Sequence, residues 1–143
     1  MTIEVKRVDN GFQLQSSNGE EKINVGVHPK FQENTSGMRP MELLLSSLGS
    51  CLSIDLLNIL YKQKIELDDF LVKLDGKRGE EPPNAYTDIE IRVLCFGDIQ
   101  ISKVGIALEA VIDKYCSVFH SLNPSILFTV NLELNDKEKV NLK

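Results

Sequence analysis

The feature that most constrains the fold is a long apolar segment from Met41 to Leu60, MELLLSSLGSCLSIDLLNIL. It follows Pro40, which suits the first turn of a helix because its missing N–H would have no partner there. Leucine and isoleucine cover most of the circumference of the predicted helix, so this helix should be buried on more than one side. In a chain of 143 residues, a second subunit is the natural cover for the remaining face.

Alternating apolar and polar residues predict strands on both sides of this helix. Before the helix we expect a three-stranded meander at 2–8, 12–16 and 22–27, followed by a loop at 28–38. After the helix we expect strands at 69–79, 87–96 and 125–134, with a second helix at 100–119 before the last strand. The charged residues after 134 are expected to fray. The order β-β-β-α-β-β-α-β predicts an α+β fold with antiparallel hairpins, in a single domain spanning residues 1–143.

Composition and charge exclude several classes of function. The net charge of −5, with lysines scattered along the chain, argues against nucleic acid or an anionic membrane as the partner. The apolar segment is interrupted by Glu42, Asp55 and Asn58, which favours a buried helix over a membrane span. The N-terminal residues lack the apolar core of a secretion signal. We therefore expect a cytoplasmic protein.

The cysteine pattern points to reduced thiols. The chain has three cysteines, an odd number, and no CxxC motif, so a secreted disulfide framework is not predicted. No metal site is predicted either, because no pair of ligands has finger-like spacing. Cys95 alternates with Val93 along a strand and is expected in the core. Cys51 is either a core residue or a nucleophile, and the small residues before it leave room for another backbone or a substrate near its thiol.

Two polar residues lie one helical turn after cysteines. Asp55 follows Cys51 on the same helix face, and we interpret it as a structural group at an interface rather than as part of a pocket. His120 follows Cys116 in the same way, and we expect a partly exposed histidine at a helix end.

Two segments resemble the OsmC/Ohr family of osmotically induced and organic-hydroperoxide-resistance proteins. They are RPMELLLSSLGSCLSIDLLNILYKQ around Cys51 and KYCSVFHSL around Cys116. The resemblance implies an intertwined homodimer, antiparallel sheets around a long central helix, and active sites at the dimer interface. It also implies that Cys51 is the peroxidatic cysteine and Cys116 the resolving cysteine. Such a pair would reduce an organic hydroperoxide, form a disulfide and be regenerated by a dithiol, without a cofactor.

The chain departs from the hydroperoxide-reducing members at two positions. Those enzymes carry a glutamate directly after the proline, where this chain has Met41, with its acid one residue later at Glu42. One residue rotates a helical side chain by about 100°, so Glu42 does not simply replace that glutamate. Those enzymes also use an arginine in the N-terminal hairpin; its nearest counterpart here is Arg7, but the matching position is closer to Asp9 or Asn10. The resemblance is therefore to the broader OsmC-like branch.

A cationic neighbour is still needed if Cys51 reacts as a thiolate. Cys51 lies about three turns into its helix, too deep for the helix dipole to lower its pKa strongly. Candidates for thiolate activation or substrate binding are Arg39 beside Pro40, Glu42, and Arg7 in the N-terminal hairpin.

Three hypotheses for the function follow from the sequence. The first is thiol-dependent reduction of organic hydroperoxides through Cys51 and Cys116, as part of a stress response. The second is a non-peroxidatic thiol redox protein or sensor that uses the same pair. The third is a small-ligand-binding dimer in which the thiols have no role.

Overall fold

A computed structural model describes residues 1–143 as two compact units, Met1–Ser46 and Ser47–Lys143. The boundary falls inside α1 (Pro40–Lys62), the helix predicted from the apolar segment. The predicted α+β class is confirmed, with two sheets and their helices.

The first unit is the predicted antiparallel meander, with strands somewhat shorter than expected. It consists of β1 (Glu4–Arg7), β2 (Leu14–Ser17) and β3 (Lys22–Val25), in the order β1-β2-β3. The loop after β3 is held to the meander by the side chain of Gln13, which donates to the Val25 and Ser36 carbonyls at 3.1 and 3.0 Å. Its amide oxygen also accepts the Ser36 N–H at 2.7 Å. Because this loop is tied down, the chain enters α1 from a fixed position within the unit.

Both ends of α1 follow recognised capping chemistry. Leu43 N–H donates to Arg39 O at 2.9 Å, which makes Arg39 the N-cap, and the Glu42 carboxylate accepts the Arg39 N–H at 2.8 Å. This is the reciprocal half of a capping box. At the other end, Lys64 takes a positive φ of 57° and Ile65 N–H donates to Leu60 O at 2.9 Å, the Schellman arrangement.

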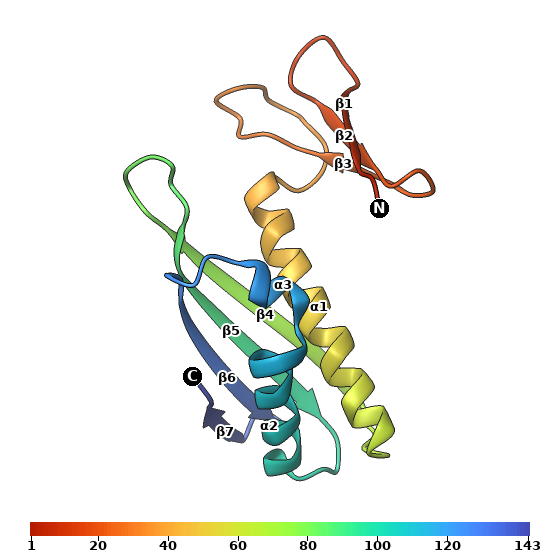
Figure 1. Cartoon of the computed structure of the whole chain (residues 1–143), viewed down its shortest axis with the longest axis vertical. Coiled ribbons are helices and arrows are strands. Elements are labelled where there is room, and N and C mark those ends of the chain that lie inside the picture. The colour runs from red at the N-terminus through yellow and green to blue at the C-terminus, as the bar shows by residue number, and fades with distance from the viewer. The chain divides into compact units, whose positions relative to one another are not determined.

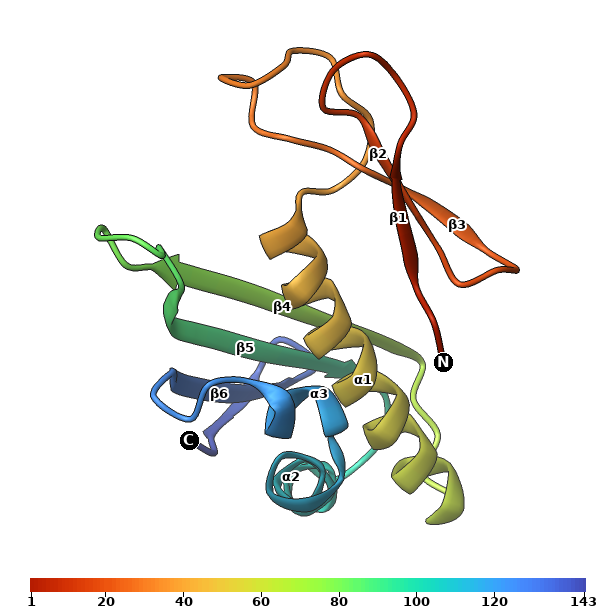
Figure 2. The same cartoon turned by 45° about the horizontal axis from the view of Figure 1, so that its top comes forward.

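The second unit is built on a four-stranded sheet in the order β4-β5-β6-β7. Its strands are β4 (Asp69–Arg78), β5 (Tyr86–Phe96), β6 (Leu127–Leu134) and β7 (Glu138–Asn141). Between β5 and β6 the chain forms α2 (Ile101–Ala110), the π-helical turn η1 (Val111–Tyr115) and α3 (Ser117–Ser121). In this unit, α1 and α2 lie on the same face of the sheet, α1 over β4 and β5 and α2 over β6 (Figures 1 and 2).

The core lies between this sheet face and the helices. One face of α1 contributes a leucine at every fourth position, and β5 contributes every second residue. All of these side chains are at most 1% exposed: Leu48, Leu52, Leu56 and Leu60 from α1, and Ile89, Ile91, Val93 and Cys95 from β5. The prediction that Cys95 is a core residue is therefore confirmed. Gly49 allows α1 to approach β4 closely, because a Cβ at this position would lie 2.6 Å from Leu74 Cδ1.

Three details of the predicted architecture are wrong. The four-stranded sheet is mixed rather than antiparallel, because β5 and β6 run parallel. The helical segment from α2 through α3 connects these two strands and returns the chain to the end of the sheet where β5 began. The residues after 134 do not fray but form β7. Asn135 and Asp136 both adopt positive φ, and Lys137 N–H donates to Leu134 O at 3.0 Å, so a tight turn brings β7 onto the edge of β6.

The third difference concerns the second helix, predicted as continuous over 100–119. It widens into the π-helical turn, where Cys116 N–H donates to Val111 O at 2.9 Å, and it breaks at Cys116, whose backbone is extended. Such turns occur frequently at functional sites, and this one sets the position of a cysteine.

The face of α1 opposite the leucines is uncovered in the single chain. Ile54 and Tyr61 are 67% and 82% exposed, and Leu57 lies between them on the same stripe. By length and mean hydropathy alone, α1 could span a membrane, but this is weak evidence because a core helix passes the same test. The single chain therefore leaves an apolar stripe on α1 exposed to solvent.

Candidate functional site

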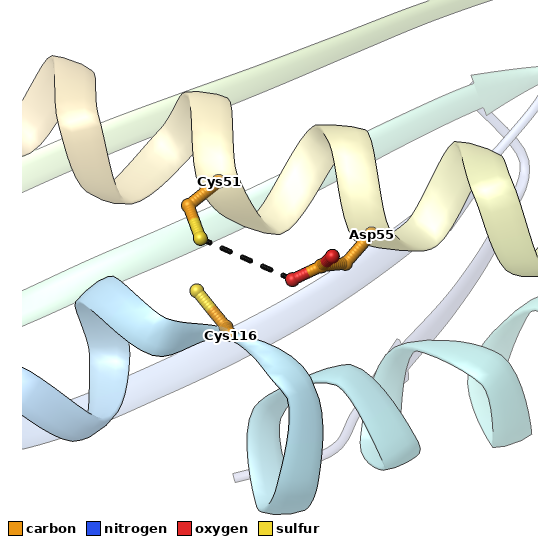
Figure 3. A group of neighbouring side chains, drawn as sticks. All are labelled: Cys51, Asp55 and Cys116. Atoms are coloured by element: carbon orange, nitrogen blue, oxygen red, sulfur yellow. Dashed lines mark hydrogen bonds between the residues drawn. The ribbon is translucent and has the colours of Figure 1, made fainter.

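The structure brings Cys51 and Cys116 together from segments 65 residues apart in the sequence. Cys51 lies on α1, one position before the buried Leu52, and its side chain is half-buried. Cys116 lies at the break between η1 and α3 and is fully buried. Figure 3 shows the two sulfur atoms pointing toward each other. Both thiols are free.

Asp55 completes a cluster of three polar side chains. Its Oδ2 lies 3.9 Å from Cys51 Sγ, and the two sulfurs and the carboxylate oxygen all lie within 4.8 Å of one another (Figure 3). The position of Asp55 follows from helix geometry, because residues four apart on a helix share a face. Asp55 therefore belongs to the thiol site, although the sequence was interpreted as giving it a structural role.

The two thiols differ in their access to solvent and in their chemistry. Burial raises the pKa of the Cys116 thiol to about 11. This value includes a lowering of the pKa by the backbone N–H of Phe119 and smaller increases caused by the neighbouring Cys51 thiol and by the negative charge of Asp55. Burial likewise raises the pKa of Cys95 to about 11. Cys116 is thus held as a neutral thiol, whereas half-buried Cys51 is open to a reagent.

A disulfide between Cys51 and Cys116 requires only local movement. The sulfur atoms are at most 4.8 Å apart and must approach to about 2 Å. Cys116 sits at a break in the helix, where its backbone already has extended angles. The two thiols are therefore close enough for a disulfide to form after a local movement.

A cavity of about 510 Å³ lies beside this cluster. It is formed by one side of α1, by α2 and by the π-helical turn, and its lining is partly apolar and partly polar: Asp55, Asn58, Ile59, Lys62, Gln63, Ile106, Ala107, Ala110 and Tyr115. Through Asp55 it adjoins the thiol pair. A small molecule with an apolar body and a polar end has the matching chemistry.

The other residues predicted for the site lie in the first unit, where the structure gives two of them local roles. Glu42 caps the first turn of α1 through the Arg39 N–H. Arg7 ends β1 and helps to lower the pKa of Asp9, an effect caused first by a hydrogen bond from the Gln32 side chain. The Asp9 carboxylate accepts the Gly11 N–H at 2.8 Å and so shapes the hairpin turn. A role of Arg39, Glu42 or Arg7 at the thiols stays a prediction.

His120 is exposed at the end of α3, as expected, with its ring edge-on to Phe119 at 5.6 Å between centroids. It is therefore a helix-end residue.

Together, the fold and the site define a class of small α+β proteins in which a long helix presents one cysteine to a second cysteine from a later helical segment. The chain belongs to the OsmC-like protein family, whose model matches residues 32–131. Family proteins are typically homodimers and are generally soluble and bacterial. This membership confirms the predicted resemblance.

Three known proteins illustrate the similarity. Protein YhfA of Escherichia coli is 32% identical over 111 residues, which cover 75% of this chain and 83% of YhfA. A hypothetical protein from Aquifex aeolicus has a crystal structure with a TM-score of 0.83 and 31% identity, covering 96% of this chain and 97% of that one. An organic hydroperoxide resistance protein from Elizabethkingia anophelis matches with a TM-score of 0.72 and 16% identity, covering 94% and 97%. The last similarity shows the fold alone.

Proposed function

We propose that this protein is a thiol-dependent peroxidase that reduces organic hydroperoxides in the cytoplasm, with Cys51 peroxidatic and Cys116 resolving. Membership of the OsmC-like family supports a stress-response redox role. The observation that carries the proposal is the meeting of a half-buried thiol and a fully buried thiol within 4.8 Å. One thiol can meet a substrate, and the other can reach only its neighbour.

The proposed chemistry has three balanced steps. The Cys51 thiol gives up its proton, the resulting thiolate attacks the terminal peroxide oxygen, and the O–O bond breaks; the leaving alkoxide takes up one proton to become the alcohol, and Cys51 becomes a sulfenic acid. The Cys116 sulfur then attacks the Cys51 sulfur, water leaves, and a disulfide forms. A dithiol reductant restores both thiols and is itself oxidised to a disulfide.

The structure suggests where an organic hydroperoxide would bind. The cavity offers Ile59, Ile106 and Ala110 to an apolar group, and its lining includes Asp55, the neighbour of Cys51. Burying an apolar group gains about 25 cal/mol for each Å² removed from water, so a bulky organic peroxide should bind better than hydrogen peroxide. We expect activity to increase with the apolar surface of the substrate.

We further propose that the protein acts as a homodimer through the exposed face of α1, with its sites at the interface. Ile54, Leu57 and Tyr61 form an apolar stripe that the single chain leaves uncovered. A second copy of the helix would bury it and would give α1 the second covered face that its sequence predicts.

A thiol redox sensor is the second candidate, and Asp55 is the observation that favours it. Asp55 places a negative charge, and not a cation, beside the two thiols. Its negative charge also opposes thiolate formation nearby. Because the charged neighbour of the two thiols is an acid, the pair would react slowly with peroxides and serve as a sensor.

The test is consumption of cumene hydroperoxide by catalytic amounts of reduced protein with a dithiol present. We expect turnover well beyond the amount of protein, its loss in Cys51→Ser, and its retention in Cys95→Ala, which changes a core thiol outside the cluster. With Cys116→Ser, turnover with the dithiol should fall strongly because the sulfenic acid is not resolved. Unchanged turnover in Cys51→Ser would refute the peroxidase assignment. Disulfide formation without turnover would instead favour the sensor.

A further inference from the structure

The Cys51, Asp55 and Cys116 cluster has a second chemical capacity besides forming a disulfide. It gathers two sulfur ligands and one oxygen ligand, all within 4.8 Å of one another, from α1 and from the segment that joins η1 to α3 (Figure 3). These residues are far apart in the sequence or lie four residues apart on a helix, so no spacing motif reveals them as a ligand set.

The separation between the Cys51 sulfur and the Asp55 oxygen is close to that of two ligands in a tetrahedral metal centre. Zinc–sulfur bonds of about 2.3 Å and zinc–oxygen bonds of about 2.1 Å at tetrahedral angles place sulfur and oxygen about 3.6 Å apart, and two sulfurs about 3.8 Å apart. The Cys51 Sγ to Asp55 Oδ2 distance is 3.9 Å. We propose that the reduced protein binds one divalent zinc ion through Cys51, Asp55 and Cys116.

Charge and ligand type both favour such an ion. Two thiolates and a carboxylate in a half-buried cluster repel one another, and a divalent cation offsets most of this charge. Thiolate ligands select zinc over magnesium or calcium, which prefer oxygen alone. Cys51 and Asp55 are half-buried, and Asp55 lines the adjoining cavity, so a water molecule has room for the fourth position. Three protein ligands and one water are the pattern of an accessible zinc site.

Binding must release the thiol protons, so the affinity should rise with pH. Metal and disulfide use the same two sulfur atoms and therefore exclude each other. The inference rests on the cluster geometry and does not require peroxidase activity.

The test is anaerobic titration of the full, reduced, metal-free and untagged protein with Co²⁺, which gives thiolate charge-transfer and tetrahedral d–d absorption. We expect saturation at one equivalent and displacement of cobalt by zinc. Cys51→Ser and Cys116→Ser should each abolish the tetrahedral dithiolate spectrum. Asp55→Asn should weaken binding by more than roughly tenfold, since even outer-shell partners contribute that much. Cys95→Ala is the matched control and should bind as the native protein does.

Absence of cobalt–thiolate absorption in native protein with three titratable thiols would overturn the proposal. A spectrum that persists in both Cys51→Ser and Cys116→Ser would also overturn it, by placing the metal elsewhere. Hydroperoxide consumption is measured separately on the metal-free protein. If the metal-free protein does not consume hydroperoxide, the peroxidase assignment fails and the metal site is unaffected. If cobalt does not bind, the metal site fails and the peroxidase assignment is unaffected.

Discussion

The structure predicts a fixed order in which the three thiols react with an alkylating reagent. Cys116 and Cys95 are at most 1% exposed, and burial is the main cause that raises the pKa of each to about 11 from an ordinary 9.0. Near pH 8, a rise of two pKa units leaves about a hundredfold fewer thiolates than an ordinary cysteine has. Cys51 is half-buried and accessible, so it should be alkylated first.

The assay is pulse labelling of the reduced native protein with iodoacetamide, followed by denaturation, digestion and mass spectrometry of the three cysteine peptides. At pH 8, Cys116 should react about a hundredfold more slowly than a free cysteine. Its rate should increase with pH until about pH 11, because its thiolate fraction rises up to the raised pKa. In denaturant, the three cysteines should react at similar rates.

The variant Cys51→Ser separates the causes of the raised pKa. Because burial is the largest cause, Cys116 should remain slow when the neighbouring thiol is removed. Labelling of Cys116 as fast as that of Cys51 in the native protein would refute the division into an accessible and a buried thiol. A large acceleration in Cys51→Ser would show that Cys51, rather than burial, controls Cys116.

The remaining predictions concern stability and assembly. Leu56 is fully buried, so Leu56→Ala should lower the free energy of unfolding, measured by urea denaturation, by about 2–5 kcal/mol. Leu127 is 69% exposed, so the control Leu127→Ala should lower it by less than about 1 kcal/mol. The contribution of Cys95 to stability should be complete below pH 9 and decrease as the pH rises toward 11, because folding raises the pKa of this thiol. Denaturation of the native protein and of Cys95→Ala across this pH range should show the decrease as a shrinking difference in their free energies of unfolding. Ile54→Asn with Tyr61→Glu should give monomers in sedimentation, and a native protein that is itself monomeric would contradict the dimer through α1.

Local patterns in the sequence predicted the elements well. The alternation of Ile89, Ile91, Val93 and Cys95 correctly placed one face of β5 in the core. The last strand, β7, was missed because its residues are charged and all exposed, so no apolar pattern marks them. Its formation depends on the turn at Asn135 and on the free edge of β6, and both are features of the folded sheet.

The site was predictable only in part for the same reason. Residue type and the family resemblance singled out Cys51 and Cys116, but their contact depends on how α1 and the second helix pack on the sheet. The π-helical turn and the break at Cys116 leave no clear mark in the apolar periodicity. The proximity of Asp55 to Cys51 follows from helix spacing alone, whereas its proximity to Cys116 does not.

The most direct test of the central claim is intact-mass spectrometry of reduced protein after brief exposure to stoichiometric cumene hydroperoxide, in parallel with Cys116→Ser. We predict that the native protein loses two hydrogens by forming the Cys51–Cys116 disulfide, and that the variant gains one oxygen at Cys51. If neither mass changes and all three thiols remain titratable, the claim that Cys51 and Cys116 form a redox-active pair is contradicted.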